Sequence, residues 1–111
     1  MKIGLIRRVT LDDVIKNIVS EYYFTAAEGV AAKSHDDRTF FIPADLQRLT
    51  FCVLVLRNGF TVSGESVCAD LVNINTEAEK EIAKNNAIEK VWAFMDYELH
   101  SRIALRSFEM A

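Results

Sequence analysis

The sequence predicts an α+β fold: a small antiparallel sheet centred on a hairpin at residues 49–67, with an N-terminal helix and a long or broken C-terminal helix. Asn58-Gly59 separates two runs of strand-forming residues, which is the strongest short-range signal for a hairpin. Two segments with helical spacing of apolar residues flank it, each opened by a threonine with an acid three positions later. At 111 residues, the chain is expected to form a single domain over residues 1–111.

The hairpin is expected to close through a two-residue type I′ turn at Asn58 and Gly59, because both positions of that turn need a positive φ that these residues tolerate. This turn would set Val55 across from Val62 and create two distinct faces. The predicted core face carries Phe51, Val53, Val55, Val62, Gly64 and Ser66. The other face, which carries Cys52, Leu54, Leu56, Thr61, Ser63 and Glu65, has a composition suited to partial cover within one subunit.

The segment before the hairpin is expected to begin with a helix of about three turns, opened by a capping box at Thr10 and Asp13. Residues 21–27 follow as a strand, because they are rich in aromatic residues and threonine. Residues 28–47 contain a charged run and the only proline, Pro43. We therefore expect a loop insertion over 28–47, which is too long for a simple connection.

The C-terminal segment is expected to form a helix from a second capping box, Thr76 to Glu79. No glycine or proline follows Gly64, so this helix could continue to about residue 106 and reach about 45 Å. A break near Phe94–Asp96 is equally compatible with the sequence. The predicted apolar stripe comprises Ile82, Ile88, Val91, Trp92, Met95, Leu99 and Ile103.

The composition narrows the possible partners and the compartment. A formal net charge of −3 argues against a general binder of long nucleic acid. Cys52 and Cys68 have neither metal-binding nor redox-motif spacing, so we expect reduced thiols in a reducing compartment. No signal peptide and no membrane-spanning apolar run is recognisable in the sequence. These observations predict a cytoplasmic protein that does not bind a membrane.

No catalytic set stands out. His35 lies beside two aspartates and His100 falls late in the C-terminal helix, and we interpret both as solvated side chains. Neither histidine has a partner four residues on, so a metal pair is unsupported. Ser63 and Ser66 lack the glycine-framed elbow of a hydrolase. The sequence therefore predicts a protein that is not an enzyme and needs no metal or cofactor.

Two pairs of cations on the C-terminal helix are candidates for ligand binding. Lys80 and Lys84, like Arg102 and Arg106, are four residues apart, and like charges at that spacing are slightly destabilising unless something compensates. The lysines have glutamates within reach, which favours a solvated ion-pair lattice. Glu98 can reach Arg102, but no acid meets Arg106 within the helix. The spacing of these two arginines is compatible both with anion binding and with a solvated surface that binds nothing.

Three further residues have more than one interpretation. Asn85 and Asn86 are poor helix formers, each roughly 0.6 kcal/mol worse than alanine, at the middle of the expected helix. They could cap a kink, or present amides to a ligand or to a twin helix. Phe60 borders the hairpin turn, where core packing and stacking on a ligand are both possible.

The amino-acid sequence of the hairpin and of the helix after it resembles the sequences of a known family. The residues that carry the resemblance are Arg57-Asn58-Gly59-Phe60, Gly64-Glu65-Ser66-Val67-Cys68, Ile82-Ala83-Lys84, Ala87, Lys90-Val91-Trp92 and Tyr97. They are similar to a family of small tailed-phage proteins known by gene-product numbers forty-nine and sixty-six. The chain departs from the family pattern at Ala93, where proline is common, at Asp96, where glycine is common, and at Lys84, where arginine is usual.

This family looks similar to the anti-defence sponge proteins that counter the bacterial Thoeris system. The resemblance implies binding, without turnover, of a cyclic nucleotide signal, either a cyclic ADP-ribose isomer or a cyclic oligonucleotide. It also implies a homo-oligomer, a dimer or a trimer of dimers, with the ligand held between subunits. The ligand-binding candidates are Lys84, Asn85, Arg102, Arg106 and Phe60, the arginines chosen on chemistry more than on alignment.

The sequence is also compatible with an alternative function: a phage module that binds a host protein through its apolar sheet face and takes no small ligand. Half of the residues are apolar (50%), which is high for a monomer of this length. We therefore expect an oligomer, with either the Leu54/Leu56 face or the C-terminal helix at the interface.

Overall fold

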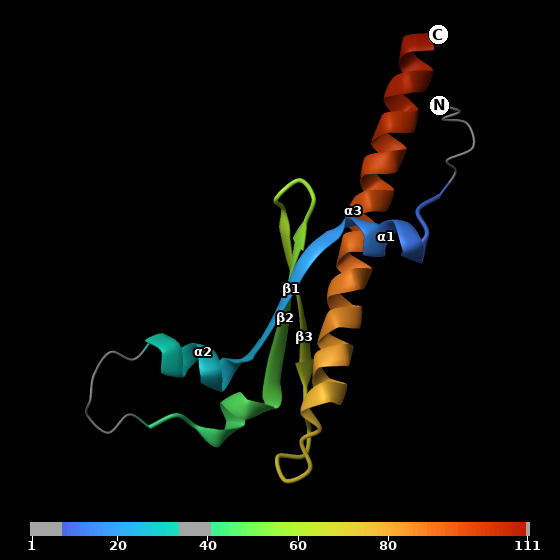
Figure 1. Cartoon of the computed structure of the whole chain (residues 1–111). Helices are drawn as coiled ribbons and strands as arrows, with labels where there is room; N and C mark the ends of the chain where they lie inside the picture. Colours follow the sequence, from blue (N-terminus) through green and yellow to red (C-terminus); the bar gives the residue numbers. More distant parts are fainter. Residues whose placement is uncertain (1–7, 34–40, 111) are drawn as a thin grey trace.

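One antiparallel sheet and one long helix dominate the structure, a computed structural model that describes residues 8–33 and 41–110. The strands lie in the order β1-β2-β3, and α3 runs along one face of the sheet and past its end (Figure 1). This arrangement confirms the α+β fold class. The elements are α1 (Leu11–Asn17), β1 (Ile18–Thr25), α2 (Ala26–Lys33), η2 (Ala44–Arg48), β2 (Leu49–Leu56), β3 (Thr61–Val67) and α3 (Thr76–Met110).

The core lies between α3 and one face of β2 and β3. Cys52 and Leu54 are fully buried there. The helix lies very close to the sheet, since a methyl group at Gly64 would overlap the backbone of Ala83 and Ala87. Small residues at this crossing therefore set the distance between layers. The buried apolar cluster comprises Val9, Val14, Cys52, Leu54, Leu56, Val62, Ala83, Ala87, Ile88 and Val91.

The hairpin turn contains three residues, so the predicted two-residue turn is wrong. The Leu56 amide donates to the Phe60 carbonyl (2.9 Å), and the Gly59 amide donates to the Leu56 carbonyl (2.9 Å). Among the described residues only Gly59 has a positive φ, 85°, whereas a type I′ turn would also need one at Asn58. This is the geometry of a type I turn followed by a glycine bulge.

The extra turn residue moves the register by one position and exchanges the two faces of the hairpin. Leu54 lies opposite Val62, so the predicted pairing of Val55 with Val62 is wrong. The predicted core face is the open one, and the Leu54/Leu56 face packs under α3 of the same chain. It is therefore not available as an oligomer interface. The open face carries Tyr22, Phe24, Phe51, Val53, Val55, Thr61, Ser63 and Glu65.

The segment before the hairpin agrees with the sequence in part. The capping box of α1 is confirmed, because Thr10 and Asp13 exchange backbone-to-side-chain hydrogen bonds. The helix ends after about two turns at Asn17, and β1 starts earlier than expected. The predicted loop over 28–47 contains most of α2 and all of η2 except Arg48, so the prediction of an irregular segment is wrong in these two helices. Residues 34–40 of that loop lie outside the described residues.

The C-terminal helix α3 is unbroken, so the alternative with a break near Phe94–Asp96 is wrong. Its 35 residues correspond to about 52 Å. It begins at Thr76, and its cap lies one residue earlier than predicted, because the Asn75 side chain accepts the Ala78 amide hydrogen (3.1 Å). The last turns extend beyond the sheet (Figure 1).

Candidate functional site

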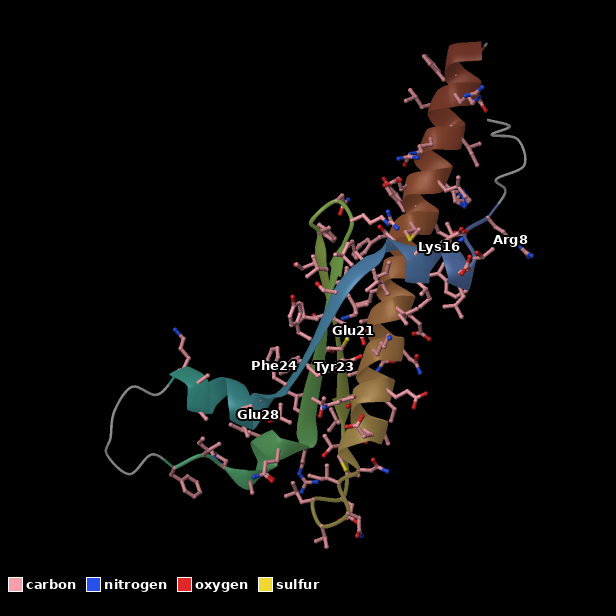
Figure 2. The ribbon with its side chains drawn as sticks, in the orientation of Figure 1. Arg8, Lys16, Glu21, Tyr23, Phe24 and Glu28 are labelled. Atoms are coloured by element: carbon pink, nitrogen blue, oxygen red, sulfur yellow. The ribbon has the colours of Figure 1, made fainter. Side chains whose placement is uncertain are left out.

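A cavity of about 750 Å³ lies where α1, the hairpin turn and the middle of α3 meet. We call it the cationic cavity, because four of its lining residues are basic. Arg8 and Lys16 lie at opposite ends of the α1 segment, and the Arg8 side chain points outward from the rim (Figure 2). Carboxylates, amides, one hydroxyl and three apolar side chains complete the lining. The polar residues that line it are Arg8, Lys16, Arg57, Arg102, Asp13, Glu98, Asn17, Asn58 and Thr10.

Direct hydrogen bonds hold the walls of the cationic cavity together. The Arg57 backbone amide donates to the Asn17 carbonyl (3.0 Å), and its Nε donates to the Lys16 carbonyl (2.7 Å). Arg57 thus binds the last carbonyls of α1, which have no partner within the helix. On the other wall, Trp92 Nε1 donates to the Val9 carbonyl (3.0 Å). The hairpin turn, α1 and α3 are therefore fixed relative to one another.

Four basic and two acidic residues line the cationic cavity, and Lys16 also pairs with Asp12 on α1 at 2.9 Å. Hydrogen bonds from Thr10 lower the pKa of the Asp13 carboxyl, which is committed to the cap of α1. Arg102 pairs with Glu98 at 2.9 Å, and both side chains are largely exposed, 76% and 60%. A pair so exposed contributes little to stability, so an anionic ligand can replace Glu98 at the guanidinium. The oxygens of a phosphate group match the spacing of the paired N–H donors of a guanidinium.

A second cavity of about 610 Å³ lies beside β1, between α1 and α3. Lys84 Nζ lies 2.8 Å from a Glu21 carboxylate oxygen, and the two side chains are 33% and 40% exposed. Lys80 Nζ lies 5.8 Å from the centre of the Tyr23 ring, within reach of a cation–π contact. The lysines of this cavity therefore already have partners. Its lining residues include Leu11, Ile15, Glu21, Tyr23, Glu77, Lys80, Glu81, Lys84, Asn85 and Ile88.

Beneath the second cavity, Cys52 lies across from Tyr23 in the sheet. Burial raises the pKa of the Cys52 thiol, and burial also raises the pKa of the Tyr23 phenol. The two groups therefore stay protonated at neutral pH and pack as polar members of the core. Both cysteines are free; Cys52 is fully buried, whereas Cys68 is partly exposed.

The two thiols are expected to differ strongly in reactivity. Cys52 is fully buried and its raised pKa leaves little thiolate at pH 8, so a disulfide reagent should modify it only after unfolding. Cys68 should react in the folded protein. Ellman's reagent should therefore give one fast equivalent for the wild type and none for Cys68→Ser. Two equally fast equivalents in the folded protein would contradict this assignment.

The structure separates the five predicted ligand residues. Arg102 lines the cationic cavity, whereas Lys84 and Asn85 line the second cavity. Arg106 is exposed one turn beyond Arg102 on α3. Phe60, which is half exposed, packs edge-on against Phe94 with ring centres 5.6 Å apart and lines neither cavity. Within one chain, the predicted residues therefore do not form one site.

The sequence did not reveal the other cations of the cationic cavity. Arg57 belongs to the family motif around the turn, and its place in that motif is the sequence signal that could have marked it as a site residue. Arg8 and Lys16 reach the cavity only because α1 docks between the turn and α3. Among the described residues, no group of three histidines, cysteines or acids is arranged to hold a metal ion. His35 lies outside those residues, and His100 is exposed on α3.

Comparison with protein families identifies the chain. The model of the Phage protein (N4 Gp49/phage Sf6 gene 66) family matches residues 9–103, which include α1, the whole sheet and most of α3. The chain belongs to this phage protein family. The resemblance seen in the hairpin and helix motifs is thus confirmed at the level of the family. No curated protein sequence and no solved structure matches the chain at a significant level. In the described part of this family member, no helix is long and apolar enough to cross a membrane.

Proposed function

We propose that this phage protein is an anti-defence sponge that binds a cyclic nucleotide immune signal in the host cytoplasm and holds it without turnover. The observation that supports it is the cationic cavity, where Lys16, Arg57 and Arg102 surround about 750 Å³ in an acidic protein. This volume lies in the range of small-ligand sites. A nucleotide with phosphate groups has both the charge and the hydrogen-bond acceptors that these residues require. The cyclic class of ligand rests on the resemblance to Thoeris sponge proteins that the sequence motifs suggest.

The spacing of the remaining candidates supports a site shared between subunits. Asn85 and Arg102 are roughly 25 Å apart along α3, at about 1.5 Å per residue. One nucleotide cannot bridge that distance within a chain, but two oppositely directed copies of α3 bring Asn85 of one subunit near the arginines of another. The exposed end of α3, where Leu105 and Phe108 are 59% and 81% exposed, suits such a contact. A homo-oligomer, a dimer or a trimer of dimers, follows from this proposal.

Isothermal titration calorimetry of the wild type tests the proposal. The ligand panel contains cyclic ADP-ribose isomers, cyclic dinucleotides and cyclic trinucleotides, with linear ADP-ribose as the matched control. We expect one class of cyclic compound to bind and to raise the melting temperature, and heat denaturation of the complex should release that compound with its mass unchanged. Absence of binding across the panel would contradict the sponge function, and a changed mass would contradict sequestration without turnover.

A second function, binding of a host protein, has its own support in the open face of the sheet. Tyr22 is 57% exposed, and the rings of Phe24 and Phe51 lie 5.3 Å apart on that face. The apolar face invoked by this alternative is therefore the one opposite to the face that the sequence predicted. Absence of binding across the nucleotide panel, together with loss of host-protein capture on Tyr22→Lys, would favour this function over the sponge.

A further inference from the structure

The two edges of the sheet are treated differently by the rest of the chain. At the β3 edge, side chains of α3 bind the outward carbonyls: Lys90 Nζ donates to the Ser63 carbonyl (2.7 Å), and Asn86 Nδ2 donates to the Glu65 carbonyl (2.7 Å). Lys90 also lies 3.6 Å from the Glu65 carboxylate. The β3 edge is thereby closed to another strand, which is a common protection of exposed edges.

In the part of the chain that the structure describes, the β1 edge has no such cover. Backbone groups alternate in direction along a strand, and the Leu56–Phe60 hydrogen bond shows which residues of β2 face β3. It follows from the register that Tyr22 faces β2, whereas Glu21 and Tyr23 direct their backbone groups outward. Within residues 8–33 and 41–110, no partner is found for these outward groups. Strands with free outward groups are templates for pairing with another chain.

Both ends of this free edge are closed. The outward amide of Thr25 donates to Glu28 Oε1 (2.9 Å), in a capping box that begins α2. At the other end, the register of β1 shifts between Ile18 and Ser20, which places a bulge at Val19. The pairing-competent window is therefore short and is centred on Tyr22.

Only one register of an antiparallel β1–β1 pair uses the free backbone groups of this window without a conflict. Pairing Glu21 with itself would oppose like charges, and centring on Tyr23 would require the Thr25 amide that Glu28 already binds. Centring on Tyr22 places Glu21 across from Tyr23 of the second copy in both directions. Each Tyr23 ring carries a Lys80 ammonium at 5.8 Å, so a carboxylate of one copy lies close to a cation of the other. Charge and hydrogen-bond geometry thus select the same register.

We propose that β1 pairs antiparallel with β1 of a second copy, with Tyr22 on the two-fold axis. The pair joins the two sheets into one and extends the open apolar face across both copies. It also places the second cavities of the two copies next to the shared strands, since Glu21 and Tyr23 line that cavity. This interface depends on no ligand, so it can be tested separately from the nucleotide proposal.

Disulfide trapping of Tyr22→Cys tests the interface, in a Cys68→Ser background that removes the partly exposed native thiol. At the axis the two Cα atoms should lie about 4.5 Å apart, within the range that a disulfide bridges. Mild oxidation should give a covalent dimer of twice 12.6 kDa on a non-reducing gel. The matched control is Phe24→Cys, on the same face but roughly 14 Å from its copy, which should stay monomeric on the gel. A dimer from both variants, or from neither, would overturn the proposal.

Hydrogen exchange of the wild type provides a second readout that needs no substitution. The Glu21 and Tyr23 amides should be protected at high protein concentration and should lose protection on dilution, while the Tyr22 amide, bonded within the sheet, stays protected throughout. Fast exchange of the Glu21 and Tyr23 amides at every protein concentration would overturn the proposal. That result is also the one expected if the β1 edge pairs with a strand of a different protein instead of a second copy.

Discussion

Replacing Gly64 with alanine is expected to lower the free energy of unfolding by about 3 kcal/mol or more. Gly64 lies where β3 meets α3, and the added methyl group would overlap backbone atoms of Ala83 and Ala87. Backbone cannot rotate away as a flexible side chain can, so the helix must move off the sheet. That movement would also loosen the packing of Leu54 and Val91, both fully buried.

The measurement is thermal or urea unfolding of Gly64→Ala beside Gly29→Ala. Gly29 lies in α2, where the nearest atoms to an added methyl group are those of the Phe24 ring at 3.8 Å, an ordinary contact. Gly29→Ala should therefore be neutral or stabilising by up to about 1 kcal/mol. The melting temperature of Gly64→Ala should fall by roughly 10 °C or more. Equal melting temperatures for the two variants would contradict the close approach of α3 to β3 at Gly64.

The sequence predicted the hairpin but not its register, and the reason lies at Asn58. Asn-Gly suggests positive φ at both turn positions, yet only Gly59 adopts it among the described residues. The Asn58 side chain instead accepts the Phe60 amide hydrogen (2.9 Å), a local bond that asparagine makes in turns of several types. One added residue in the turn was enough to exchange the core and open faces of β2 and β3.

Local signals predicted helix starts better than helix lengths. The capping box at Thr10 predicts the start of α1 correctly, whereas the start of α2 at the same pattern, Thr25 and Glu28, is not among the predicted helix starts. At α3, the threonine pattern at Thr76 competed with Asn75, which provides the cap. The end of α1 depends on contacts that the local sequence does not reveal: Arg57, from the hairpin, binds its final carbonyls.

The candidate site was predictable only for residues that share one helix. Arg102 and Arg106 follow from their spacing, as do Lys84 and Asn85, but their separation along α3 becomes decisive only because the helix is unbroken. Arg57 enters the cationic cavity through the docking of the turn on α1, which is a tertiary contact. The family motif includes Arg57, so motif positions and charge together give a better guide than either one alone.

If the protein sequesters a cyclic nucleotide, Arg102→Ala is expected to weaken that binding by about tenfold or more. A charge-assisted hydrogen bond to phosphate contributes roughly 1.5–3 kcal/mol when partly desolvated, and about 1.4 kcal/mol is one decade of affinity. Arg102→Lys, which keeps the charge but loses the fork, should fall between alanine and the wild type. The melting temperature without ligand should hardly change, because the Arg102 side chain is 76% exposed and pairs only with a neighbour on its own helix.

Calorimetry with the tightest cyclic nucleotide of the panel measures this effect, with Lys33→Ala as the charge-matched control, since Lys33 is exposed in α2 far from the cationic cavity. Arg106→Ala belongs to the same series: a shared site between subunits predicts a loss comparable to that of Arg102→Ala, whereas a site confined to one chain predicts a smaller one. If Lys33→Ala weakened binding as much as Arg102→Ala does, the effect would reflect net charge alone, and the cationic cavity would not be the binding site.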